Sequence, residues 1–259
     1  MLVNDDGYEA KGIWSMQGAL VSAGYEVVFV APKRQQSWSG KSLFDHSPLT
    51  YEIMEVKGQI VHVLDATPAA CVRIALHDIM EEPPLFVVSG INHGGNDGIQ
   101  FMMSSGTLGA ALEASLDGVR SIATSLAYAP GGYSQNTNDL DKAFKNAALV
   151  TVRIIKKLES YEFPDEIDAL NLNVPYQIEE PSVAVCKPSR ETYGRIYHRN
   201  SVDELFEKKL DSELFDTKIS RKEHTDSYYL RKGQPSITPI SLEIASEAGL
   251  SKLQQALEL

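Results

Sequence analysis

Apolar positions at the start of the chain follow first a strand pattern and then a helical one. Residues 1–3 are apolar and predict the end of a β-strand, although only these residues stand before Asn4. Residues 11–24 carry apolar side chains at every third or fourth position, which predicts an amphipathic helix. The apolar run at residues 25–31, which ends at Pro32, predicts a buried strand. This order of elements predicts a β-α-β unit whose two strands lie parallel.

The same patterns recur as far as residue 175 and predict a sheet of several strands. Alternation at residues 49–64 predicts a β-hairpin, and the pair Thr67-Pro68 is typical of a helix start. Further strands are predicted at 85–88, 119–125 and 167–175, and helices at 67–80, from about 104 onward, and at 138–158. Because strands alternate with helices, we expect an α/β fold with a mostly parallel sheet, which the strand at 167–175 closes.

The pattern changes beyond residue 176, where segments are shorter, charges are denser and periodicity is weaker. Hairpins and loops are expected there, followed by a final strand at residues 236–240 and a terminal helix at 242–258. We therefore divide the chain into a core at residues 1–175 and a C-terminal extension at residues 176–259.

Composition narrows the class of protein. With 259 residues, 43% hydrophobic and 23% charged, the chain suits a globular fold with a sizeable core. The net charge of −11 argues against stable nucleic-acid binding, which needs a basic face. Two cysteines far apart, Cys71 and Cys186, fit a reducing compartment. No signal peptide is visible and no apolar run approaches the roughly 20 residues that span a bilayer, so we expect a cytoplasmic protein without membrane contact.

Polar side chains follow three of the predicted parallel strands. Asp5 and Asp6 come after the first strand, Ser37 after the second, and Asn92 with Asn96 after the strand at 85–88. Because the carboxyl ends of parallel strands share one edge of a sheet, these side chains can converge. Two adjacent carboxylates repel each other, and a set of oxygen ligands favours Mg²⁺ or Mn²⁺. Taken alone, the two aspartates are equally consistent with capping and turn residues.

A second candidate for anion binding is the start of the helix near residue 104. Small residues in this segment precede rising helical propensity, and Ser105, Gly106 and Thr107 stand at the expected first turn. The free N–H groups of a helix start can receive an anion. In the polar loop after the second strand, Ser39 and Ser42 are interpreted as hydrogen-bonding residues and not as ligands.

The order of these motifs resembles the SurE (survival protein E) family of nucleotidases and acid phosphatases. The resemblance covers nearly the whole chain and rests on short blocks in family order. The blocks are Asn4–Gly7, Val30–Pro32 with Gln36–Ser42, Thr67–Cys71, Ser89–Asn92 with Gly94 and Asn96, Ser105–Thr107, Asn171–Pro175 and Ser236–Ile240.

The resemblance implies a fold, an activity and a site. The fold would be a Rossmann-like, mostly parallel sheet with helices on both faces and a smaller C-terminal extension, whose hairpin joins subunits into a homodimer or homotetramer. The activity would be a divalent-metal-dependent hydrolysis of nucleoside monophosphates, or of another small phosphomonoester, as in 5′/3′-nucleotidases and acid phosphatases. One Mg²⁺ or Mn²⁺ per subunit would be held by Asp5, Asp6, Ser37 and Asn92, with Asp5 and Asp6 also catalytic. The phosphate would be bordered by Asn96, Ser105, Gly106 and Thr107.

Some features depart from the family pattern, and other functions stay open. Ala66 and Ala70 stand where the family usually has glycine and aspartate, and residues 99–104 are one residue longer than the matching family segment. These departures concern substrate preference more than catalysis. A non-catalytic nucleotide-binding regulator on the same fold is the main alternative. A dinucleotide-dependent oxidoreductase lacks its G-x-G-x-x-G fingerprint here, and a phosphatase with a D-x-D nucleophile is disfavoured because the aspartates are adjacent.

Overall fold

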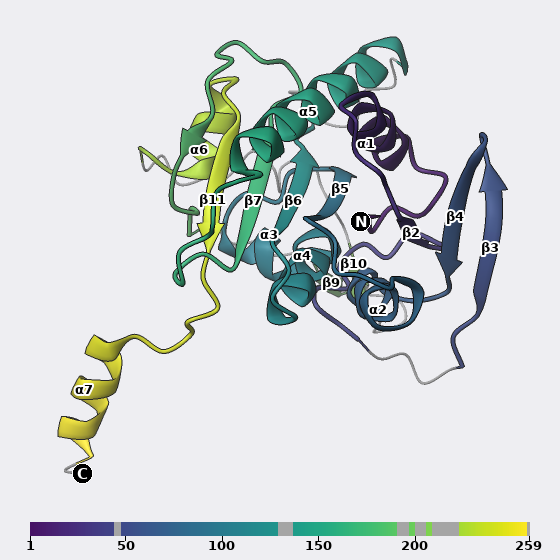
Figure 1. The fold of residues 1–259 in the computed structure, drawn as a ribbon. Helices are drawn as coiled ribbons and strands as arrows, with labels where there is room; N and C mark the ends of the chain where they lie inside the picture. The colour runs from purple at the N-terminus through teal and green to yellow at the C-terminus, as the bar shows by residue number, and fades with distance from the viewer. Residues whose placement is uncertain (44–47, 129–136, 191–196, 200–205, 209–222, 258–259) are drawn as a thin grey trace.

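The computed structural model describes residues 1–43, 48–128, 137–190, 197–199, 206–208 and 223–257 (Figure 1). Its centre is a nine-stranded sheet. The strands lie in the order β3 (Tyr51–Val56), β4 (Gln59–Leu64), β2 (Phe29–Pro32), β1 (Leu2–Val3), β5 (Val87–His93), β6 (Ser121–Leu126), β7 (Ala169–Val174), β11 (Ser236–Ile240) and β8 (Ala184–Val185). All neighbouring strands from β4 to β7 are parallel, so the predicted α/β class with a mostly parallel sheet is confirmed.

Helices cover both faces of this sheet (Figure 1). One face carries α1 (Lys11–Ser22) and α5 (Thr137–Leu158), and the other carries α2 (Pro68–Ile74) and α4 (Gly106–Leu116). The strand period of two explains the two cores, because Leu2 packs with the first helix pair and Val3 with the second. A π-helical turn at Ala75–Ile79 extends α2 to about the predicted end.

Several element boundaries differ from the sequence-based expectation. Strand β2 begins at Phe29 and not at residue 25. Its neighbour β1 is short, and the pairing of the two strands starts with Leu2 opposite Phe29. Strand β5 continues to His93, so Asn92 lies on the strand and not in the loop after it. The pairing of β5 with β6 up to Leu126 explains this extension. Residues Ile99–Ser104 form an additional short helix, α3, which the sequence pattern did not predict.

The C-terminal part adds strands to the same sheet. The expectation that residues 167–175 close the sheet is wrong, because β11 pairs with β7 in antiparallel orientation and β8 pairs with β11. A short antiparallel pair, β9 (Tyr197–Arg199) and β10 (Phe206–Lys208), lies outside this sheet. Helix α6 (Asp226–Arg231) precedes β11, and α7 (Glu247–Ala256) stands clear of the body of the molecule (Figure 1). The functional division of the chain at residue 175 stays a prediction.

Candidate active site

The candidate site is built around the end of β1, where the chain leaves the centre of the sheet. Asp5 is buried, with 3% of its surface exposed, whereas Asp6 is half-buried. The Thr107 hydroxyl donates a hydrogen bond of 2.7 Å to Oδ1 of Asp5, and the His93 backbone N–H donates one of 3.0 Å to Oδ2 of Asp6. Each carboxylate is therefore oriented by donors of the chain itself, and the backbone N–H groups of Asp5 and Thr107 also donate to the Asp5 carboxylate.

The electrostatics of this pair are unfavourable without a counter-charge. Burial, and after it the negative charge of Asp6, raises the pKa of Asp5 from 3.8 to about 7, although the hydrogen bond from Thr107 acts in the opposite direction. Burial also raises the pKa of Asp6 to about 6, against the hydrogen bond from His93. Two ionised carboxylates at this place would be stabilised by a cation beside them.

The segments that carry Ser37 and Asn92 meet the aspartates at this edge. The backbone N–H of Gln36 donates to the carbonyl of Asp5 at 2.7 Å, which places the Ser37 loop beside β1. The Ser37 side chain is exposed and accepts a hydrogen bond from Gln35 at 2.9 Å. The Asn92 amide nitrogen donates to the carbonyl of Gly94 at 2.7 Å, so its amide oxygen is the atom available for a cation.

Of the residues predicted to border phosphate, three form the start of α4 next to Asp5. Ser105 caps the helix through a hydrogen bond of 3.0 Å from the Leu108 N–H, and Thr107 holds Asp5. Gly106 lies so close to Asp5 that a Cβ on it would be 2.9 Å from the Asp5 Cβ. Asn96 is different, because its buried side chain donates to the Ser125 hydroxyl at 2.8 Å and not toward the aspartates. The phosphate-binding role of these residues stays a prediction.

Two contacts that support the site were not found from the sequence. On β7, Asn173 accepts from the Asn96 N–H at 2.8 Å and Asn171 donates to the Asn96 carbonyl at 3.0 Å. Both asparagines are fully buried, so they fix the backbone of the segment that follows Asn92. Their spacing of two on one strand was visible in the sequence, but nothing local indicated which backbone they would hold.

The second unpredicted contact is a buried ion network behind the Ser37 loop. Glu113 on α4 is fully buried and accepts from Lys41 of that loop and from Arg73 of α2. A carboxylate on a helical stripe of small residues could have indicated an internal ion pair, because charged groups are buried only when they are paired.

The chemistry of the donor set fits a hard divalent cation. Two carboxylates, one hydroxyl and one amide supply only oxygen ligands, as Mg²⁺ and Mn²⁺ prefer. In the part of the chain that the structure describes, no cluster of three or more histidine, cysteine, aspartate or glutamate side chains could hold a metal.

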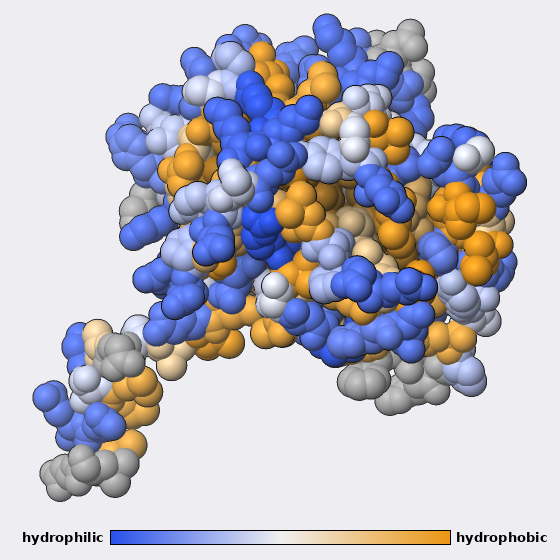
Figure 2. All heavy atoms as spheres, viewed as in Figure 1, coloured by the Kyte–Doolittle hydropathy of each residue, from blue (hydrophilic) through white to orange (hydrophobic). Residues whose placement is uncertain are grey.

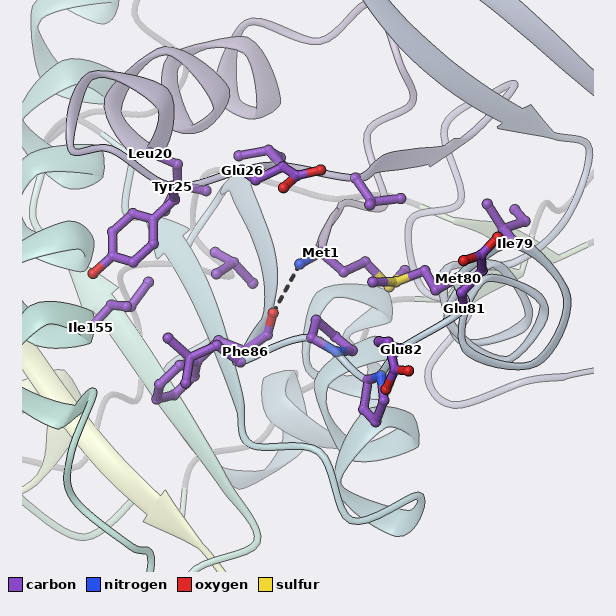
Figure 3. Close-up of a pocket in the computed structure, with 16 residues that line it drawn as sticks. Met1, Leu20, Tyr25, Glu26, Ile79, Met80, Glu81, Glu82, Phe86 and Ile155 are labelled. Carbon is purple, nitrogen blue, oxygen red and sulfur yellow. Dashed lines mark hydrogen bonds between the residues drawn. The ribbon is translucent and has the colours of Figure 1, made fainter.

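A cavity of about 390 Å³ lies at the other end of the sheet (Figure 3). Met1, Val28 and Phe86 line it, and the amino group of Met1 donates to the Phe86 carbonyl at 3.0 Å. These residues precede β1, β2 and β5, whose opposite ends lead into the candidate site, so this cavity is separate from that site. Among the described helices, none is both long enough and apolar enough to cross a membrane.

Comparisons with known proteins agree with this geometry. The family model described as "Survival protein SurE" matches residues 1–195. The 5′-nucleotidase SurE of Clostridium beijerinckii is 34% identical over 271 residues, covering 100% of this chain and 98% of the relative. That of Thermosynechococcus vestitus is 36% identical over 217 residues, covering 82% of this chain and 74% of the relative. The crystal structure of the SurE protein from Aquifex aeolicus superimposes with a TM-score of 0.78 at 29% identity, covering 99% of this chain and 98% of the other.

Proposed function

Since this chain belongs to the SurE family, we propose that it is a 5′-nucleotidase, which hydrolyses nucleoside 5′-monophosphates to a nucleoside and phosphate. The family and the phosphomonoester-hydrolase class predicted from the sequence are confirmed. The observation that carries the proposal is the pair of adjacent carboxylates, the buried Asp5 beside the start of α4 and the half-buried Asp6 next to it. Hydrogen bonds from the chain orient both carboxylates, from the Thr107 hydroxyl to Asp5 and from the His93 N–H to Asp6.

Asp5, Asp6, Ser37 and Asn92 are the residues that would hold one Mg²⁺ or Mn²⁺ in this site. When bound, such an ion polarises a phosphoryl oxygen and lowers the pKa of water. The remaining chemistry belongs to the chain itself. Thr107 holds Oδ1 of Asp5, which leaves Oδ2 near Gly106 at the start of α4. Free N–H groups of a helix start stabilise the charge of a phosphate and of its transition state.

The subunit assembly and the location of the protein are further parts of the proposal. A homodimer or homotetramer that uses the C-terminal extension is supported by α7, whose leucines are exposed in the single chain. A cytoplasmic location is supported by the small number of cysteines. Preference for 5′- over 3′-nucleotides is supported only by the name of the relatives.

The decisive experiment measures phosphate release from 4-nitrophenyl phosphate and from a panel of 5′- and 3′-nucleotides. We expect turnover with Mn²⁺ or Mg²⁺ and its loss after chelation. Asp6→Asn removes one carboxylate charge from the site and should abolish metal-dependent turnover. Asp141→Asn is the matched control, because Asp141 of α5 forms an exposed ion pair with Lys11 of α1.

Two results would contradict the proposal. Turnover that is indifferent to chelation, or full activity of Asp6→Asn, would exclude the metal site as described. Nucleotide binding without turnover on any monoester would instead indicate the non-catalytic regulator.

A further inference from the structure

Ser39 is a buried hydroxyl without a hydrogen-bond partner beside the candidate site. Among the described residues, its Oγ is one of the few buried side-chain oxygens that neither donates nor accepts a hydrogen bond. The expectation that Ser39 serves as a hydrogen-bonding residue of its loop is therefore wrong for its side chain. A buried hydroxyl without a partner costs about 1–3 kcal/mol, so such a group in a functional site needs an explanation.

The position of this hydroxyl is defined by Gly106, the first residue of α4. A Cβ placed on Gly106 would lie 2.7 Å from the Ser39 Oγ and 3.2 Å from Oδ2 of Asp5. The two oxygens therefore flank the same point at the start of the helix. Gly106 is needed there because any side chain would occupy that point.

The loop holds Ser39 in place without using the hydroxyl. The backbone N–H of Ser39 donates to the Gln36 carbonyl at 3.2 Å, and the N–H of Gly40 donates to the Ser104 carbonyl at 3.0 Å. Because these backbone hydrogen bonds hold the loop, the Ser39 hydroxyl is not needed to fix its position.

We propose that the Ser39 hydroxyl donates a hydrogen bond to the phosphate of the substrate. A hydroxyl offers a proton, and an anion bound beside Gly106 at the start of α4 would accept it. The Asp5 carboxylate beside it is already oriented by Thr107, which supplies a separate donor. The proposal rests on the proposed function and assigns a further substrate-binding residue to the same reaction.

The test compares Ser39→Ala with Ser42→Ala and Ser39→Thr in the full chain. Ser42 lies on the same loop with an exposed side chain, and threonine keeps the hydroxyl. We expect Ser39→Ala to raise KM for adenosine 5′-monophosphate and the inhibition constant of inorganic phosphate by about tenfold, the loss typical of a hydrogen bond to an ionic group. Ser42→Ala should match the parent protein, and Ser39→Thr should retain phosphate binding.

Two further measurements separate this role from others. The affinity for Mn²⁺ without substrate should stay within about twofold of the parent. The melting temperature without ligands should not fall in Ser39→Ala, because the hydroxyl has no partner to lose. The rise in melting temperature with inorganic phosphate should shrink.

Unchanged phosphate inhibition in Ser39→Ala would overturn the proposal, as would a weaker affinity for Mn²⁺ with unchanged phosphate inhibition. A lower melting temperature without ligands would show a structural role instead. An inactive parent protein would count against the proposed function. In that case, a comparison of phosphate affinity between the parent and Ser39→Ala would still test the role of Ser39.

Discussion

The adjacent carboxylates predict an unusual dependence of stability on pH. The folded protein holds protons on Asp5 and Asp6 up to a pH of about 7 and about 6, whereas the unfolded chain releases them near its ordinary pKa of 3.8. The folded state therefore binds more protons than the unfolded state between these values. The contribution of these two groups to the free energy of unfolding of the metal-free protein should therefore be largest below pH 3.8. It should fall as the pH rises toward about 7.

Urea unfolding of chelator-treated protein at several pH values measures this contribution. Each unit by which a pKa is raised corresponds to about 1.4 kcal/mol. The free energy of unfolding should therefore fall by more than about 1 kcal/mol over this pH range. Asp5→Asn keeps an oxygen for the Thr107 hydroxyl and should flatten the profile. Saturating Mn²⁺ should restore stability mainly at the higher pH, because protons compete with the cation for the carboxylates. A parent profile as flat as that of Asp5→Asn would contradict this interpretation.

The ion network of Glu113 predicts an asymmetry between its partners. Glu113 has no exposed side-chain surface, whereas the side chains of Lys41 and Arg73 are 31% and 43% exposed. Removal of both cations by Lys41→Met with Arg73→Met would leave a buried carboxylate without a counter-charge, which costs about 3–5 kcal/mol. Glu113→Gln leaves two cations that water can reach, so it should cost less, on the order of 1 kcal/mol. Urea unfolding of the three proteins gives the comparison, and a costlier Glu113→Gln would refute it.

At the scale of elements, the close contact between α1 and β5 depends on one glycine. A Cβ on Gly12 would overlap the carbonyl oxygen of Ile91, the residue before Asn92. Gly12→Ala should therefore push α1 away from the sheet, destabilise the protein by about 1–3 kcal/mol and weaken Mn²⁺ binding. Gly18→Ala on the same helix is the control, because a Cβ there meets no atom within 4 Å. That change should stabilise the protein by about 0.5–1 kcal/mol. Thermal unfolding and Mn²⁺ titration of both variants test this, and equal effects would contradict it.

The elements show why some boundaries could be predicted and others could not. The hairpin β3–β4 and helix α5 follow from local alternation and helical spacing, and both lie where the sequence predicts them. Strand β5 runs five residues past its apolar start, through Ser89 to His93, since β6 offers backbone partners as far as Leu126. A glycine-rich polar segment carries no local sign of such pairing, so only the neighbouring strand determines where β5 ends.

At the scale of the whole molecule, topology made it predictable that the segments of the candidate site meet at one edge of the sheet. Parallel strands bring their carboxyl ends to one edge, and the backbone contacts of Asp5 with Gln36 and of Asp6 with His93 lie there. The lack of a hydrogen-bond partner for the Ser39 hydroxyl was not predictable, because it depends on how closely Gly106 of α4 approaches the loop. Whether a buried side chain finds a hydrogen-bond partner depends on tertiary packing, and residue types along the chain do not reveal it.

The last helix of the chain presents an apolar stripe that the single molecule does not cover. Leu250 and Leu253 lie on one face of α7, and Leu257 follows at its C-terminal cap, with 45%, 57% and 57% of their surfaces exposed. Figures 1 and 2 show this helix clear of the body with apolar side chains along it. An isolated helix of 10 residues is marginal in water, even with the cap that Ser246 provides. We therefore expect a second copy of the chain to bury this stripe in solution.

Leu250→Asp combined with Leu253→Asp should convert the assembled protein into monomers, because each change places a charge in the proposed interface. Gln255→Asp puts one negative charge on the opposite face of α7 and should leave the assembly intact. Light scattering after size-exclusion chromatography gives the mass of each species, and phosphate release measured on the same fractions shows whether the monomer remains active. A parent protein that elutes as a monomer would exclude the proposed interface. A double variant that keeps the mass of the parent would place the subunit interface elsewhere. Because the aspartates, the Ser37 loop and α4 all belong to one chain and lie at the sheet edge, the isolated monomer should retain turnover and lose mainly stability.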